Sequence, residues 1–227
     1  KKVLGSLTEL YKVIKGRLKA FKKIFNRPRR TILENIEHTE YVEEVKVEDI
    51  YILIDRFGYT KSLDAASYTR VSEENLKDYT HIITMKNTDK LCFFTAEGNM
   101  YQIKANSIPK CKIKDKGTLI HSLSKITKED IIMYSSFEAL FESQLLFTTK
   151  NGFIKLVSGA EYETNRSMLS ATKLEPDDLV ISIKMLSSHE ALSGNGKVIL
   201  LTEKGLSLGF PLLEVIELKK PSRGVKA

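Results

Sequence analysis

The stretch Tyr51-Ile-Leu-Ile-Asp-Arg-Phe-Gly-Tyr-Thr-Lys61 decides the fold of this chain. A run of β-branched and apolar residues leads into a short polar turn, and a second run bearing a lysine follows. Gly58 closes the turn, where a tight hairpin needs a positive φ that only glycine adopts without steric cost. The stretch therefore predicts a β-hairpin.

The same pattern occurs three more times, in Leu91–Lys104, Leu145–Lys155 and Val198–Leu208. The turn glycines stand at positions 58, 98, 152 and 205. Similar hairpins at near-regular spacing are typical of a radial repeat, in which only short sheet edges are left open. Unrelated hairpins in a sandwich are the alternative, and the regular spacing disfavours it. We expect a mainly β chain, with a propeller-like ring of four-stranded blades over residues 49–227.

The first residues have a helical pattern. Ser6 and Glu9 have the spacing of a capping box, and Pro28 is expected to end the helix. Apolar residues follow in alternating steps of four and three, the heptad spacing that packs against a partner helix: Leu7, Tyr11, Ile14, Leu18, Phe21 and Phe25. We expect residues 1–30 to be the end of a longer coiled-coil arm, and 31–48 an acidic connector.

The positive charge is concentrated at this end. The net charge is +7, but residues 1–30 hold eleven Lys or Arg and one Glu, and residues 31–64 hold three Lys or Arg and nine Asp or Glu. About +3 is left for the rest of the chain. A nucleic-acid role for the β domain therefore depends on local clusters of cations.

Other features exclude several classes. No apolar run approaches the ~20 residues of a membrane span, and no signal peptide is visible. Cys92 and Cys111 form no CxxC pattern, and the four histidines have no metal-ligand spacing. We expect free thiols in a reducing cytoplasm, and no metal or cofactor in this chain.

Several short motifs resemble one known family. Arg29-Arg-Thr31 follows the helix, Gly58-Tyr-Thr-Lys61 lies in the first hairpin, and Ile108-Pro109 precedes a basic loop. Ser222-Arg-Gly-Val-Lys-Ala227 is similar to a segment that opens a later blade. In order and spacing these motifs resemble the C-terminal DNA-binding domain of the A subunit of bacterial type IIA DNA topoisomerases, over essentially the whole chain. The resemblance implies a β-pinwheel, whose blades exchange strands. Family members have five or six blades, so the four recognised here suggest a partial ring.

The resemblance favours topoisomerase IV over gyrase. Gyrase A subunits carry a basic, glycine-rich box after the first blade, because close approach to phosphates needs glycines and several cations. Residues 63–77 contain no glycine, and Glu73 and Glu74 offset Arg70 and Lys77. A gyrase domain with a degenerate box remains an alternative. A propeller used only for protein–protein contacts is another.

DNA binding is expected through backbone contacts. Lys110, Lys112, Lys114 and Lys116 alternate, so an extended segment would project all four to one side. The other candidate DNA-binding residues lie in a second cluster and along the rim: Lys219, Lys220, Arg223, Lys226, Lys104, Lys155, Arg166 and Lys173. Such cations release counterions and offset the bending of 20–30 base pairs, about 1–6 kcal/mol. The modest charge favours a bent or captured segment over a tight wrap.

No catalytic constellation is present. Ala65-Ala-Ser-Tyr68 has a tyrosine without the arginine that precedes the family's catalytic one, so Tyr68 is expected to pack on its blade. There is no phosphate-binding glycine loop. The resemblance implies that ATP and magnesium act on other domains of a larger enzyme. Its partners would be duplex DNA, the ATPase B subunit and a second copy of the A subunit, with no membrane.

Overall fold

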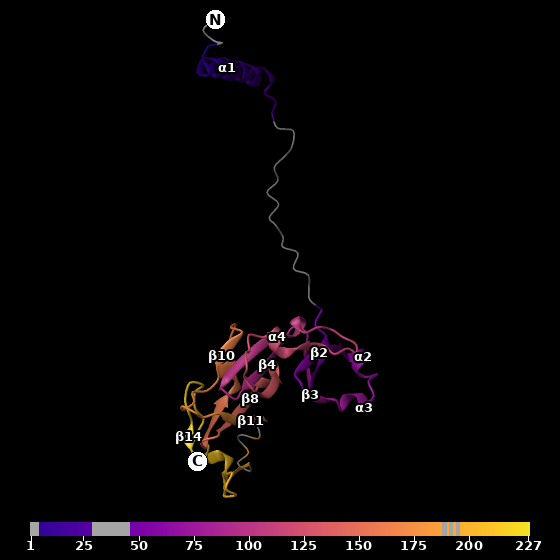
Figure 1. The fold of residues 1–227 in the computed structure, drawn as a ribbon, viewed down its shortest axis with the longest axis vertical. Coiled ribbons are helices and arrows are strands. Elements are labelled where there is room, and N and C mark those ends of the chain that lie inside the picture. Colours follow the sequence, from indigo (N-terminus) through magenta and orange to yellow (C-terminus); the bar gives the residue numbers. More distant parts are fainter. Residues whose placement is uncertain (1–4, 29–45, 188–189, 191–192, 194–195) are drawn as a thin grey trace. The chain divides into compact units, whose positions relative to one another are not determined.

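The computed structural model describes residues 5–28, 46–187, 190, 193 and 196–227. It divides into two compact units, residues 1–44 and 45–227, each of which is treated by itself (Figure 1). The Arg29-Arg-Thr31 motif and most of the expected acidic connector lie outside the described residues. No described helix is long and apolar enough to cross a membrane.

The first unit contains helix α1 (Leu7–Phe25), which is shorter than the expected arm over residues 1–30. Ser6 is the N-cap residue, but its side chain makes no capping hydrogen bond, and the Glu9 carboxylate pairs with Lys12 at 2.8 Å. The capping-box prediction is therefore wrong in its geometry. The helix ends three residues before Pro28, and its apolar stripe is exposed.

The second unit begins with a four-stranded antiparallel sheet, which we call blade 1, in the order β3-β1-β2-β6. Its strands are β1 (Asp49–Asp55), β2 (Tyr59–Asp64), β3 (Tyr79–Lys86) and β6 (Thr118–Leu119). Two short helices, α2 (Ala65–Tyr68) and α3 (Glu73–Leu76), lie between β2 and β3.

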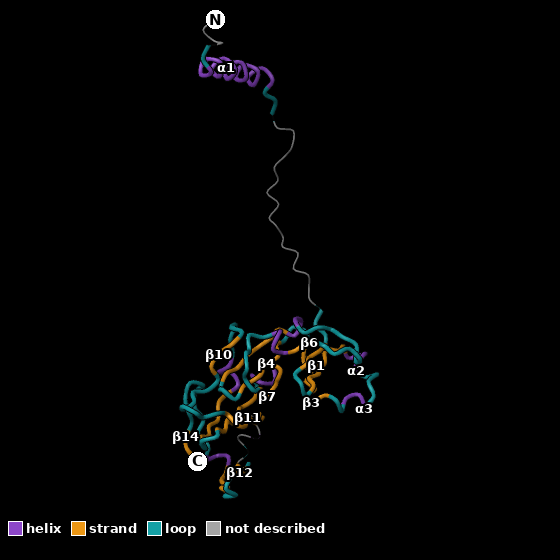
Figure 2. Tube along the Cα trace, in the orientation of Figure 1, coloured by secondary structure: helices purple, strands orange, loops and turns teal. Residues whose placement is uncertain are grey.

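Blade 2 has the order β10-β5-β4-β7, and blade 3 the order β11-β8-β9-β14. The strands of blade 2 are β4 (Lys90–Thr95), β5 (Asn99–Lys104), β7 (Ile131–Ser136) and β10 (Met168–Ser170). Those of blade 3 are β8 (Ser143–Thr149), β9 (Phe153–Ser158), β11 (Val180–Ser187) and β14 (Val225–Lys226). The fourth hairpin pairs β12 (Lys197–Leu201) with β13 (Ser207–Pro211) (Figure 2).

Short helical segments follow or precede these strands. They are η1 (Ala105–Ser107), α4 (Ile120–Leu123), α5 (Phe137–Phe141), η2 (Gly159–Tyr162) and η3 (Leu212–Glu214). Each 3-10 segment directly follows the second strand of a hairpin, β5, β9 or β13, and turns the chain toward the previous blade.

The four hairpins have the predicted turn chemistry. Gly58, Gly98, Gly152 and Gly205 all have positive φ, between 77° and 82°. At each turn an Asp or Thr oxygen accepts the amide N–H four residues later, as in Asp55 Oδ1 to the nitrogen of Tyr59 at 2.9 Å. The local sequence therefore determines these turns.

The blades exchange strands. After forming β4 and β5 of blade 2, the chain returns to blade 1 as β6, which pairs with β2. In the same way β10 returns to β5 of blade 2, and β14 to β9 of blade 3. This exchange is the topology expected of a β-pinwheel.

The apolar core lies between successive blades. One cluster joins Ile52 of blade 1 to Phe93 of blade 2, and a second joins Phe94 of blade 2 to Phe147 of blade 3. Tyr162 packs edge-on against Phe94 with 5.3 Å between ring centroids. Full burial of each such side chain contributes about 1.5–3 kcal/mol, so the blades stabilise one another.

Candidate nucleic-acid interface

The first cluster of cations lies on a turn. Residues 109–117, the first basic loop, connect η1 to β6. The amide of Asp115 donates to the carbonyl of Lys112 at 3.0 Å, and the Asp115 carboxylate accepts the amide of Lys112 at 2.9 Å. The loop is therefore a turn, and the expectation that it is an extended segment is wrong.

The four lysines are all exposed but differ in their surroundings. The Lys110 ammonium lies 3.5 Å from the Asp64 carboxylate. The Lys116 ammonium lies over the Tyr59 ring, 4.2 Å from its centroid. Lys110 and Lys116 are thus partly engaged by neighbouring side chains.

Lys61 occupies the centre of this loop. Although it is a lysine, it is only 1% exposed. Its ammonium donates to the carbonyls of Ile113 at 2.6 Å, Asp115 at 2.7 Å and Lys112 at 3.5 Å. A buried charge is tolerated only when its donors are satisfied, and here backbone oxygens satisfy them.

A second basic loop, residues 216–224, connects η3 to β14 and repeats this arrangement in blade 3. The amide of Ser222 donates to the carbonyl of Lys219 at 3.0 Å, which closes an equivalent turn. Lys155, also 1% exposed, donates to the carbonyls of Lys220 at 2.9 Å and Ser222 at 2.7 Å. Burial lowers the pKa of its ammonium to about 8.

This geometry corrects the sequence-based choice of Lys155 as a DNA contact. Its ammonium lies inside the protein, and its donors are used by the loop. Lysine is normally an exposed residue, so the sequence alone gave no reason to exclude it.

The cations of the second loop are partly engaged. The Lys220 ammonium donates to the carbonyl of Glu161 at 3.0 Å, and Arg223 forms an ion pair with Glu175. Lys219 and Lys226 are exposed. Three further candidates, Lys104, Arg166 and Lys173, are exposed on or beside blade 2.

Two cations beside the first loop were not among the predicted DNA-binding residues. Arg56, at the tip of the first hairpin, and Lys77, after α3, line a groove of about 630 Å³ together with Lys114 and Lys116. Arg56 lies in the turn of the first hairpin, two residues before Gly58. Its place at a hairpin tip was the sequence signal that predicted an exposed cation. Three carboxylates, those of Asp55, Asp78 and Asp115, also line the groove and offset most of the charge of its four cations.

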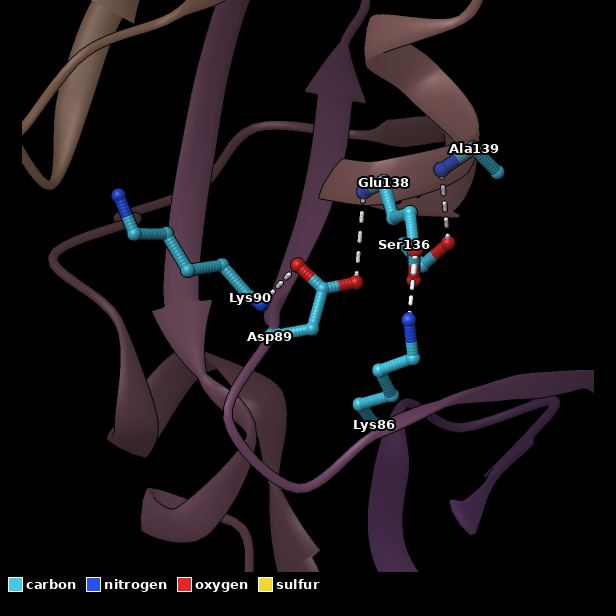
Figure 3. Close-up of polar contacts among 6 residues, drawn as sticks. All are labelled: Lys86, Asp89, Lys90, Ser136, Glu138 and Ala139. Atoms are coloured by element: carbon cyan, nitrogen blue, oxygen red, sulfur yellow. Dashed lines mark hydrogen bonds and ion pairs between the residues drawn. The ribbon is translucent and has the colours of Figure 1, made fainter. Parts of the chain in front are cut away.

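Acidic side chains near the blade 1–blade 2 junction have structural roles. The Glu138 carboxylate accepts a hydrogen bond from the Lys86 ammonium at 2.7 Å, and the Asp89 carboxylate accepts the amides of Lys90 and Glu138 (Figure 3). In the same figure the Lys90 side chain extends away from Asp89. The Lys90 ammonium donates to the carbonyl of Thr164 at 3.1 Å. These groups link β3, the start of β4 and α5.

Tyr68 stacks on Tyr51, with 3.8 Å between ring centroids and 4° between planes. This agrees with the expected packing role on the blade. Within the described part of the chain, no group of three His, Cys, Asp or Glu side chains is placed to hold a metal ion.

Known proteins resemble this chain in sequence. The DNA gyrase C-terminal domain family, a beta-propeller, matches residues 89–131 and 143–187. The A subunit of DNA gyrase from Clostridium acetobutylicum is 27% identical over 100% of this chain and 28% of its own length. The A subunit of DNA topoisomerase 4 from Bacillus subtilis is 28% identical over 99% of this chain and, again, 28% of its own length. The chain thus spans little more than a quarter of these relatives.

Solved structures agree with the fold. The crystal structure of the C-terminal domain of DNA topoisomerase IV aligns with a TM-score of 0.67 and 26% identity, over 80% of this chain and 57% of that one. The E. coli ParC C-terminal domain aligns with a TM-score of 0.63 over 79% of this chain and 71% of its own, and at 14% identity it supports the fold alone.

In fold and in sequence the chain is similar to one class of protein: the C-terminal domains of type IIA topoisomerase A subunits. Gyrase and topoisomerase IV subunits match it at nearly equal identity.

Proposed function

We propose that this domain binds and bends duplex DNA through the two basic loops and the cations beside them. One observation carries the proposal. Blades 1 and 3 each hold a loop of nine residues that is closed by a buried lysine and ends in a positive-φ glycine, Gly117 or Gly224. Repetition of a cationic loop on blades 1 and 3 suits a polymer that runs along the rim.

The chemistry of the loops favours phosphate over base recognition. Their cations are lysines and one arginine on short loops, and the helix beside the first loop, α3, has only four residues, too few to enter a groove of DNA as a recognition helix. Lysine acts on phosphate as a point charge, and each neutralised phosphate releases counterions. The domain would therefore bind with little sequence preference and hold a bent segment.

We further propose that the parent enzyme is a topoisomerase IV, in which the domain presents a DNA segment for ATP-dependent strand passage. The segment that carries the gyrase box in the family forms α2 and α3 here, with Glu73 and Glu74 exposed. Such a segment offers DNA few cations. Relaxation and decatenation would then require a second A subunit, the ATPase B subunit, ATP and magnesium, all in the bacterial cytoplasm.

The direct test of DNA binding is a salt titration. The 227-residue chain is titrated with a short fluorescent duplex at several salt concentrations, and log affinity is plotted against log salt. A slope near −0.9 for each phosphate contact is expected. A flat plot would contradict DNA binding and favour a domain that contacts only proteins.

The enzyme type is tested in the full-length A subunit with its ATPase partner. ATP-dependent decatenation without net negative supercoiling is expected. Efficient negative supercoiling of relaxed plasmid would instead identify a gyrase whose box has diverged.

A further inference from the structure

Lys61 and Lys155 occupy equivalent places. Each lies three residues after a turn glycine, on the second strand of its hairpin, and opposite a residue of the first strand, Leu53 or Phe147. Each is buried, and each donates to two carbonyls that lie four and two residues before the closing glycine of its loop. The two loops therefore fold in the same way around a buried lysine, an arrangement that we call the loop template.

The backbone of each loop is drawn around an ammonium group. In the first loop the carbonyls of Ile113 and Asp115 converge on Lys61 from across the turn, and the Tyr79 ring covers the same ammonium at 4.9 Å. Removal of the donor would leave these oxygens buried without a partner, which is unfavourable. The loop would then open toward water.

In blade 2 an uncharged side chain donates to the loop carbonyls. The Gln102 amide donates to the carbonyls of Thr164 and Arg166, at 2.9 Å and 2.5 Å, in the shorter loop before β10. The common requirement is thus a buried donor with two N–H groups, supplied from the second strand of the hairpin. The exposed cation of this loop is Arg166.

We propose that Lys61, Gln102 and Lys155 are positioning residues for DNA binding. They do not touch DNA, but they hold each loop in the shape that presents its outward cations to the phosphate backbone. This inference rests on the proposed function, because it assigns the loops a bound DNA.

The test uses Lys61→Met, Lys155→Met and Gln102→Met in the complete chain. Methionine fills similar space but cannot donate a hydrogen bond. Each variant is titrated with a short duplex at several salt concentrations, beside Lys128→Met, which removes one exposed lysine outside the loops. The control can lose at most one phosphate contact, a slope change of about 0.9.

A positioning role predicts a larger change than the charge removed. Lys61→Met should lower the salt slope by more than about 0.9, because several loop lysines lose their contacts. Gln102→Met should lower the salt slope although this substitution leaves the net charge of the chain unchanged. If all three variants keep the parent slope, or if the Lys61 variant loses no more than the control, the proposal is overturned.

Amide hydrogen exchange separates this inference from the proposed function. In Lys61→Met the Asp115 amide should exchange faster, whereas the Gly98 amide, in another blade's turn, should keep its protection. Parent-like exchange at Asp115 contradicts the loop template even if DNA binds. Fast exchange at Asp115 in a chain whose parent binds no DNA leaves the loop template intact and refutes only the DNA function. If Lys61→Met does not melt cooperatively, the salt slope of Gln102→Met tests the proposal instead.

Discussion

At the scale of single residues, the main finding is that lysines of this chain serve two purposes. Lys112 and Lys114 are exposed, whereas Lys61 and Lys155 are buried and bound by carbonyls. Sequence reasoning treated Lys155 as a surface cation, because its carbonyl partners come from residues 220 and 222, more than sixty positions further along the chain. Local sequence does not contain that information.

Lys155 gives the fold a specific pH dependence. Burial lowers its pKa from 10.5 to about 8. Between these values the unfolded chain holds a proton that the folded chain has released, so this group makes stability rise with pH. Below about pH 8 both states are protonated and the contribution is constant. The test measures the urea midpoints of the parent and of Lys155→Met from pH 7 to 11. Above pH 8 the midpoint of the parent should rise relative to that of the variant. A constant difference would contradict it.

Tyr68 is expected to act only through its ring. Tyr68→Phe keeps the stack on Tyr51 and should change stability by less than ~0.5 kcal/mol, whereas Tyr68→Ala removes an aromatic pair worth about 0.5–1.5 kcal/mol beyond its buried area. Thermal melts measure both.

The isolated chain should nick no plasmid with magnesium present. Nicking that disappears in Tyr68→Phe would show that the tyrosine is catalytic.

At the scale of elements, local chemistry predicted the hairpins but not their pairing. A turn glycine and an Asp or Thr three residues before it are visible in the sequence, and all four hairpins formed as expected. The return of β6 to β2 is a contact between residues nearly sixty positions apart. Strands of two or three residues carry too little pattern to be recognised, so the blades' fourth strands came from the structure.

The closing glycines provide a test of this exchange. A Cβ on Gly117 would lie 2.5 Å from the carbonyl oxygen of Thr60, at a φ of +79°. Gly152 has a similar φ of +81° but open space around it. Gly152→Ala should therefore cost about 1 kcal/mol from backbone strain, and Gly117→Ala distinctly more. Equal melting temperatures for the two variants would contradict the close packing of the first loop on β2.

At the scale of the whole molecule, the resemblance seen in the sequence agrees with the proteins to which the chain is similar, and the structure supplied the organisation of the β unit. Four glycine-centred hairpins predicted the blades, and three of them are complete four-stranded sheets in the described residues. The conformation of the basic run was misjudged. Periodicity indicates which residues share a face, but a turn such as that at Lys112–Asp115 depends on side-chain and long-range partners.

The central claim is that DNA binds at the basic loops, and one paired measurement tests it most directly. Lys110, Lys112, Lys114 and Lys116 are replaced together by Ala, and a matched variant replaces Lys125, Lys128, Lys184 and Lys197, which are also exposed and lie outside the loops. Both variants lose four charges and should melt close to the parent, since exposed substitutions usually cost within ~0.5 kcal/mol each. Fluorescence anisotropy with a short duplex at two salt concentrations then compares them. The account predicts weaker binding and a salt slope reduced by up to about 0.9 per lost contact in the loop variant, with a clearly smaller effect in the matched variant. Equal loss in both, or parent-like binding by the loop variant, would contradict it.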